Sequence, residues 1–119
     1  MDKRIAVVIL TDTETPENLG RMANALSVAK DYNTHGYTVK IIFDGAAVKW
    51  VGKVIDPHHQ FYEPFQAVKT LVKGACNYCS GAYGVREQVK KAGIPLLQEF
   101  EGHPSLRQLV DEGYQILTF

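Results

Sequence analysis

The sequence predicts a single α/β domain, a three-layer, doubly wound sheet of about five mainly parallel strands. Residues 5–10 form a continuous aliphatic run, which is typical of a strand covered on both faces. Along the rest of the chain, strand-like runs alternate with apolar residues at helical spacing, which indicates right-handed βαβ units with helices on both faces. The chain has 119 residues. This length suffices for one core but not for two, so we expect one domain over residues 1–119.

The first strand and the first helix have the clearest signals. After strand 5–10 the chain turns polar, and Thr15 is suited to cap a helix whose first position is Pro16. Apolar side chains then recur at helical spacing up to Ala29. Gly36 is suited to the left-handed conformation that ends such a helix.

The remaining elements continue the alternation. The segment 74–78 has poor strand propensity, and we expect a strand there because the βαβ alternation requires one. Pro95 indicates a strand near the margin of the sheet. The further expected strands are 37–43, 74–78, 94–97 and 114–119, and the further expected helices are 47–55, 64–72, from Cys79 or Ser80 to 92, and 104–112.

Composition excludes several classes of partner. Thirteen Lys and Arg balance 13 Asp and Glu, so the formal net charge is zero. We therefore expect neither nucleic acid nor a membrane as a partner. Apolar runs fall far short of the ~20 residues that a membrane span needs, and the first residues do not resemble a signal peptide. Two cysteines three residues apart cannot staple a distant loop, so the pair indicates thiol chemistry in the cytoplasm, metal ligation or chance.

One predicted strand end carries a nucleophile. In an open parallel sheet, ligands bind beyond the carboxyl ends of the strands, and Cys76 is placed there, ahead of a helix. Free backbone N–H groups at a helix start favour a thiolate, which makes Cys76 the candidate catalytic residue. The alternative is a buried, inert cysteine. Further residues could line this site: Thr11, Asp12, Asp44, His58, His59, Tyr78, Ser80, Gly81 and Tyr83.

Cys79 is a possible second thiol, because it completes a Cys-x-x-Cys pair with Cys76. A redox disulfide of the thioredoxin kind requires the first cysteine at a helix start. Zinc would need two more ligands, and the adjacent His58 and His59 are poorly suited to reach one ion, so no metal is expected. His35 and His103 are assigned structural roles. No glycine-rich phosphate loop follows the first strand, and no cofactor is expected.

Four segments carry a resemblance to a known family: the opening strand 4–10, the central block Gly74-Ala75-Cys76-Asn77-Tyr78-Cys79-Ser80-Gly81-Ala82-Tyr83-Gly84-Val85, and the closing segments 102–106 and 113–119. The sequence resembles the DsrE/DsrF-like family of small sulfur-relay proteins, which includes the TusD and YchN types. In its sulfur-transferring members a reactive cysteine precedes a Gly-Val pair by eight residues, a spacing that falls here on Cys76. The second cysteine, and the lack of an Ala-rich, Arg-containing run after Cys76, make the chain more similar to the stand-alone branch.

The resemblance implies a fold, an assembly and an activity. The fold is a five-stranded, flavodoxin-like and DsrE-like domain, and the assembly is a homotrimer or homohexamer. The activity is that of a cytoplasmic sulfur carrier or sulfurtransferase, which holds sulfane sulfur as a persulfide on Cys76 and passes it between donor and acceptor proteins. One alternative is a Cys76/Cys79 dithiol redox protein. The other is a non-catalytic oligomeric binding module whose crevice is walled by Tyr78, Tyr83, Phe61 and Tyr62.

Overall fold

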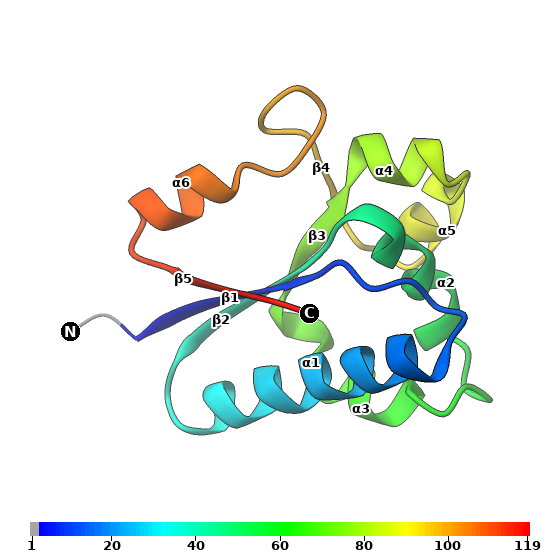
Figure 1. The fold of residues 1–119 in the computed structure, drawn as a ribbon, viewed down its shortest axis with the longest axis horizontal. Coiled ribbons are helices and arrows are strands. Elements are labelled where there is room, and N and C mark those ends of the chain that lie inside the picture. Colours follow the sequence, from blue (N-terminus) through cyan, green and yellow to red (C-terminus); the bar gives the residue numbers. More distant parts are fainter. Residues whose placement is uncertain (1–2) are drawn as a thin grey trace.

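All strands of the central sheet run parallel, in the order β4-β3-β2-β1-β5. The computed structural model describes residues 3–119 (Figure 1). The strands are β1 (Arg4–Ile9), β2 (Thr38–Phe43), β3 (Val72–Cys76), β4 (Leu96–Leu97) and β5 (Gln115–Thr118). The helices are α1 (Pro16–Thr34), α2 (Trp50–Val54), α3 (Tyr62–Gln66), α4 (Asn77–Ala82), α5 (Arg86–Lys91) and α6 (Leu106–Asp111), with 3₁₀ turns η1 (Gly45–Lys49) and η2 (Lys69–Leu71). The predicted fold class is confirmed.

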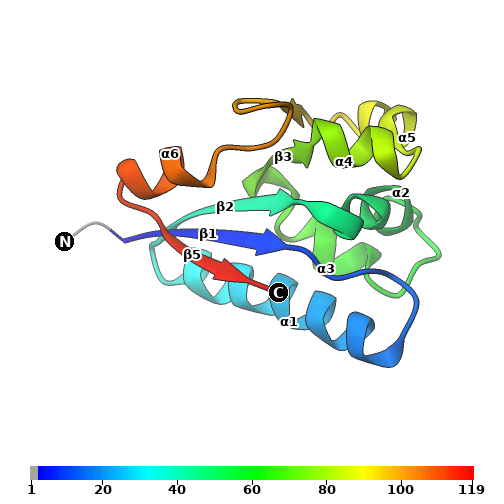
Figure 2. The same ribbon diagram turned by 45° about the horizontal axis from the view of Figure 1, so that its top comes forward.

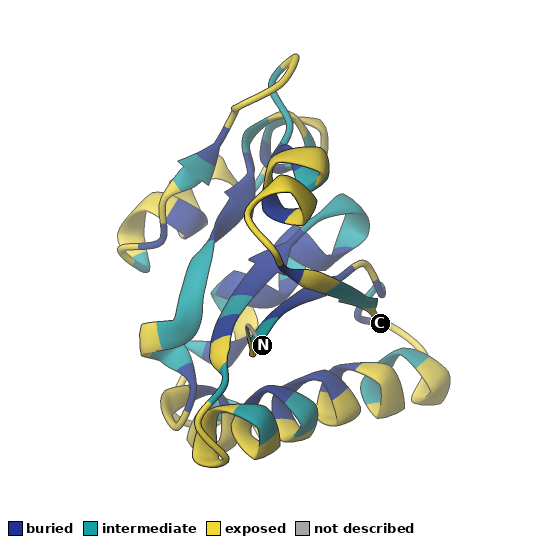
Figure 3. Ribbon diagram, turned by 90° about the vertical axis from the view of Figure 1, so that its left-hand side faces the viewer, coloured by how far each residue is buried: buried dark blue, intermediate teal, exposed yellow. Residues whose placement is uncertain are grey.

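The two faces of the sheet are covered unequally. Ile5, Val7 and Ile9 of β1 face the larger core, which includes side chains of α1, α2, α3 and α5, whereas Ala6 and Val8 face a smaller core with α6. Figure 2 shows α1 and α6 on opposite sides of the strands. Figure 3 shows buried residues along the central strands and on the side of α1 that faces them. The apolar run of β1 is thus buried on both faces, as such a run predicts.

Several local predictions are confirmed. The Thr15 side chain accepts a hydrogen bond from the Asn18 N–H and caps α1, with Pro16 at its first position. Gly36 follows the helix with φ +88°, a left-handed conformation that suits glycine. β4, which follows Pro95, is an edge strand.

The predictions for residues 64–78 are partly wrong. The helix expected over 64–72 is only α3 followed by the turn η2, because β-branched Val72 already pairs with Ile41 of the sheet. The strand expected over 74–78 is shifted toward the N-terminus. It ends at Cys76, and Asn77 and Tyr78 belong to α4. As a result α4 starts at Asn77 instead of Cys79 or Ser80, and Cys76 becomes its N-cap residue.

Two other expected helices are interrupted. In place of one helix over 47–55, the chain forms the 3₁₀ turn η1 and then α2. Asp44 caps η1, because its side chain accepts a hydrogen bond from the Gly45 N–H. The helix expected to run to residue 92 is divided into α4 and α5, because Gly84 between them has φ +69°. A left-handed residue cannot continue a right-handed helix.

The segments that follow the neighbouring strands β3 and β4 cross to opposite faces of the sheet. After β3 the chain passes to α5, whose Val89 lies in the larger core, whereas after β4 it passes to α6, whose Leu109 lies in the smaller core. Crevices of open α/β sheets form at such a switch. The two strands approach closely at Gly74, where a Cβ would lie 2.6 Å from the Pro95 carbonyl oxygen. Within residues 3–119, no helix has the length and apolar character needed to cross a membrane.

Candidate thiol site

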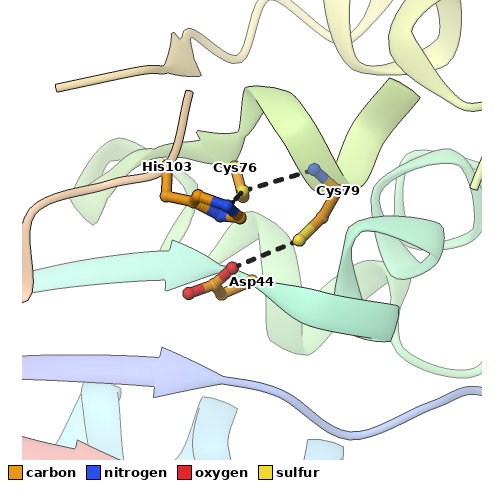
Figure 4. Close-up of side chains that lie close together, drawn as sticks. All are labelled: Asp44, Cys76, Cys79 and His103. Carbon is orange, nitrogen blue, oxygen red and sulfur yellow. Dashed lines mark hydrogen bonds between the residues drawn. The ribbon is translucent and has the colours of Figure 1, made fainter. Parts of the chain in front are cut away.

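Four side chains with metal- or proton-binding atoms meet at the carboxyl ends of β2 and β3. Asp44 follows β2, Cys76 ends β3, Cys79 lies in α4, and His103 lies between β4 and α6 (Figure 4). One ligand atom from each lies within 4.8 Å of all the others. The parallel strands bring these residues together although the chain separates them widely.

Cys76 lies at the centre of this group and is fully buried. The Cys79 N–H donates to its Sγ at 3.3 Å, and Nδ1 of His103 lies 3.3 Å from the same Sγ. Its thiol also points toward the Gly102 carbonyl oxygen at 3.9 Å. Burial raises the pKa of Cys76 from 9.0 to about 12. The hydrogen bond from the Cys79 N–H lowers this pKa, but its effect is smaller than that of burial, and the Asp44 carboxylate adds to the increase. The expected thiolate is therefore disfavoured, and the resting form is the thiol.

A tight turn holds His103 over Cys76. Phe100 and His103 exchange backbone hydrogen bonds of 2.9 and 2.8 Å, and the two residues between them, Glu101 and Gly102, have φ of +50° and +82°. The Gly102 carbonyl accepts from the Tyr78 N–H at 2.9 Å. The Tyr78 ring contacts the imidazole of His103, with ring centroids 4.8 Å apart. The 100–103 turn is therefore attached to the start of α4.

Cys79 and Asp44 form the other half of the group. The Cys79 thiol donates to Oδ1 of Asp44 at 3.6 Å, and the same oxygen accepts from the Gly45 N–H at 2.8 Å. Both side chains are only partly buried. Cys79 is thus the more accessible of two free thiols.

A charged pair lies at the neighbouring strand ends. Nζ of Lys49 contacts Oδ1 of Asp12 at 2.6 Å and lies 5.3 Å from the centre of the Tyr83 ring. The hydrogen bond from Lys49 lowers the pKa of the Asp12 carboxyl, and Asp12 raises the pKa of Lys49. Thr11 is buried, and its hydroxyl donates to the Asn18 side chain at 2.8 Å. These residues form a polar group that is separate from the four-residue cluster.

The two histidines of the 55–61 loop are not among the four clustered residues. His58 is exposed. The ring of His59 packs on Trp50, with centroids 5.9 Å apart, and its Nδ1 accepts from the Phe61 N–H at 3.0 Å. His59 thus has a packing role within its own loop, where Phe61 also contacts Trp50.

The other predicted lining residues belong to α4 and the turn after it. Tyr78 and Tyr83 are exposed, with 59% and 46% of their surface accessible. Ser80 is buried, and its hydroxyl has no hydrogen-bond partner within residues 3–119. Gly81 lies against the guanidinium of Arg86, where a Cβ would collide with it.

From the sequence, His103 was predicted to have only a structural role, and Lys49 was not predicted to line the site. A useful signal was present for His103, because it lies in the segment that follows the predicted strand 94–97. The strand-end rule applies to a whole loop and not only to its first residues. No signal in the sequence pairs Lys49 with Asp12, because that contact depends on how η1 packs beside the end of β1.

Comparisons with known proteins agree with the fold. The sequence model of the DsrE/DsrF-like family matches residues 6–119. The uncharacterised protein MJ0733 of Methanocaldococcus jannaschii is 31% identical over 100 residues, covering 84% of this chain and 81% of that protein.

Two solved structures have a similar fold. BT1422 of Bacteroides thetaiotaomicron, a conserved protein of unknown function, has a TM-score of 0.64 at 21% identity over 96% of this chain and 94% of its own. The YchN protein of E. coli has a TM-score of 0.57 at 15% identity over 98% of this chain and 99% of its own. At these identities the likeness concerns the fold alone.

Proposed function

Because the chain belongs to the DsrE/DsrF-like family, we propose that it is a sulfur carrier that holds sulfane sulfur as a persulfide on Cys76 and passes it to a thiol of an acceptor protein. The observation that carries the proposal is the contact of Cys76 Sγ with His103 Nδ1 at 3.3 Å. A nucleophile within contact distance of a base is the usual arrangement for activating a buried thiol.

The proposed loading step is a sulfur exchange in which His103 acts as the base. Cys76 attacks the terminal sulfur of a donor persulfide, R–S–SH, while its proton passes to Nδ1 of His103. A sulfur–sulfur bond forms on Cys76, the bond within the donor breaks, and the donor leaves as a thiolate that takes the proton. The products are Cys76–S–SH and R–SH, so no external oxidant is needed. The Cys79 N–H, which donates to Sγ, is positioned to stabilise the charge that develops there.

In this proposal the 100–103 turn moves to expose Cys76, because the residue is fully buried and Gly102 and His103 lie beside its sulfur. The contacts between the turn and α4 include the hydrogen bond from the Tyr78 N–H to the Gly102 carbonyl and the Tyr78–His103 ring contact. Phe100 and Tyr78 are exposed beside it, with 63% and 59% of their surface accessible. In this proposal a donor or acceptor protein covers these two aromatic rings while the turn is displaced.

Mass spectrometry tests the proposal directly. The reduced protein is incubated with a persulfide donor, and a mass increase of about 32 Da per added sulfur atom is expected. The adduct should persist in Cys79→Ser, disappear in Cys76→Ala and form more slowly in His103→Ala, whereas His59→Ala serves as a control histidine. An adduct that persists in Cys76→Ala and disappears in Cys79→Ser would refute the assignment.

A dithiol function is the second candidate, and one observation favours it. Cys76 is the N-cap of α4, as the first cysteine of a redox pair should be, and the two sulfurs lie within 4.8 Å. Cys79 could then attack a persulfide on Cys76, forming a disulfide and releasing hydrogen sulfide. Thiol titration after mild oxidation tests this candidate. Simultaneous loss of both thiols supports it, and two remaining free thiols exclude it.

The proposal includes assembly into a homotrimer or homohexamer. Exposed aromatic side chains and zero net charge are compatible with self-association. Light scattering coupled to size-exclusion chromatography measures the assembly. A monomer at all concentrations tested would contradict this part of the proposal.

A further inference from the structure

We propose that Asp44, Cys76, Cys79 and His103 form a binding site for one zinc ion. The four residues supply a carboxylate oxygen, two sulfurs and an imidazole nitrogen, all within 4.8 Å of one another. They come from the end of β2, the end of β3, α4 and the 100–103 turn. This inference shares Cys76 and His103 with the sulfur-carrier proposal but does not require that proposal to be correct.

The distances fit a small tetrahedral site. With zinc–sulfur bonds of about 2.3 Å and zinc–nitrogen or zinc–oxygen bonds of about 2.0–2.1 Å, tetrahedral ligand atoms lie roughly 3.3–3.8 Å apart. The two measured contacts across the group are 3.3 Å between Cys76 Sγ and His103 Nδ1, and 3.6 Å between Cys79 Sγ and Asp44 Oδ1. Every other pair lies within 4.8 Å. A contraction of roughly 1 Å in the longest separation completes the tetrahedron.

The donor set selects the type of metal. Two cysteine sulfurs and an imidazole favour zinc over magnesium and calcium, which take shells made of oxygen ligands. Binding would release the two thiol protons, since zinc coordinates thiolates. The two thiolates and the Asp44 carboxylate carry three negative charges, which the ion largely offsets.

Backbone groups already hold two of the four ligands. The Gly45 N–H donates to Oδ1 of Asp44 at 2.8 Å, and the Cys79 N–H donates to Sγ of Cys76 at 3.3 Å. The ring of His103 is held by its contact with Tyr78, with centroids 4.8 Å apart. Such supporting contacts orient ligands before a metal arrives and raise its affinity.

Cobalt titration of the reduced, chelator-treated protein tests the site. We expect Co²⁺ to bind at one ion per chain with a thiolate-to-cobalt charge-transfer band and the intense visible bands of tetrahedral cobalt. Zinc should displace it with the same stoichiometry. Cys79→Ser and Asp44→Asn should each weaken binding at least about tenfold. Asp44→Asn retains Oδ1 as the acceptor for the Gly45 N–H, and Asp12→Asn is the matched control, with unchanged affinity.

Two results would overturn the inference: a cobalt spectrum without thiolate charge transfer, or equal affinities for Cys79→Ser and Asp12→Asn. Circular dichroism of each variant shows whether a loss of affinity reflects unfolding. The persulfide assay separates this inference from the sulfur-carrier proposal. Asp44→Asn should lose zinc affinity and still gain sulfur on Cys76, and zinc loaded beforehand should block sulfur gain in the wild type.

Discussion

Burial of Cys76 predicts a slow reaction with alkylating reagents. The perturbation is the Cys79→Ser variant, in which Cys76 is the only cysteine. Burial raises the pKa of its thiol from 9.0 to about 12. Three pKa units correspond to a roughly thousandfold smaller thiolate fraction near neutral pH, and only the thiolate is alkylated rapidly.

The assay measures iodoacetamide alkylation by intact mass in buffer with a chelator, and again in urea, where Cys76 has an ordinary environment. We expect the native rate to be about three orders of magnitude lower than the unfolded rate, after correction for the effect of urea on a small thiol. Cys79 in the Cys76→Ser variant provides a half-buried comparison and should react faster. Native alkylation of Cys76 as fast as in urea would refute the reasoning and would place its proton on His103 in the resting protein.

Three further predictions concern the framework and its pH dependence. Trp50→Phe removes an indole N–H that donates to the Thr11 and Asp12 carbonyls at 3.1 and 3.2 Å, and should lower the free energy of unfolding by about 1–3 kcal/mol in urea denaturation. Gly74→Ala places a Cβ 2.6 Å from the Pro95 oxygen and should destabilise the chain by about 1–3 kcal/mol, measured likewise; an unchanged midpoint would contradict the close approach of β3 and β4. Because the pKa of Cys76 is higher in the folded chain, the unfolded state loses this proton first as pH rises, so stability should fall between pH 9 and about 12. The Cys76→Ser variant should lack that part of the decrease. Identical pH profiles of stability for the wild type and this variant would contradict the prediction.

Much of the fold could be predicted because its signals are local. The aliphatic run of β1, the Thr15 cap and the left-handed Gly36 each act within a few residues, and each is present as predicted. Predictions failed where tertiary pairing outweighed local pattern. Val72 continues an apolar helical spacing, yet it pairs with Ile41 in the sheet, because sheet pairing overrides the spacing of one short segment.

The candidate site divides in the same way. The sequence by itself determined that Cys76 lies in a strand followed by a helix, because the βαβ alternation requires a strand there, although this strand ends two residues earlier than predicted. Only the tertiary structure decided that His103 and Asp44 join the two cysteines, since their contacts link positions 27 and 35 residues apart along the chain. It also decided the environment of Cys76, because the chain folds so that this residue is fully buried, with Gly102 and His103 beside its sulfur, and burial raises the pKa of the thiol.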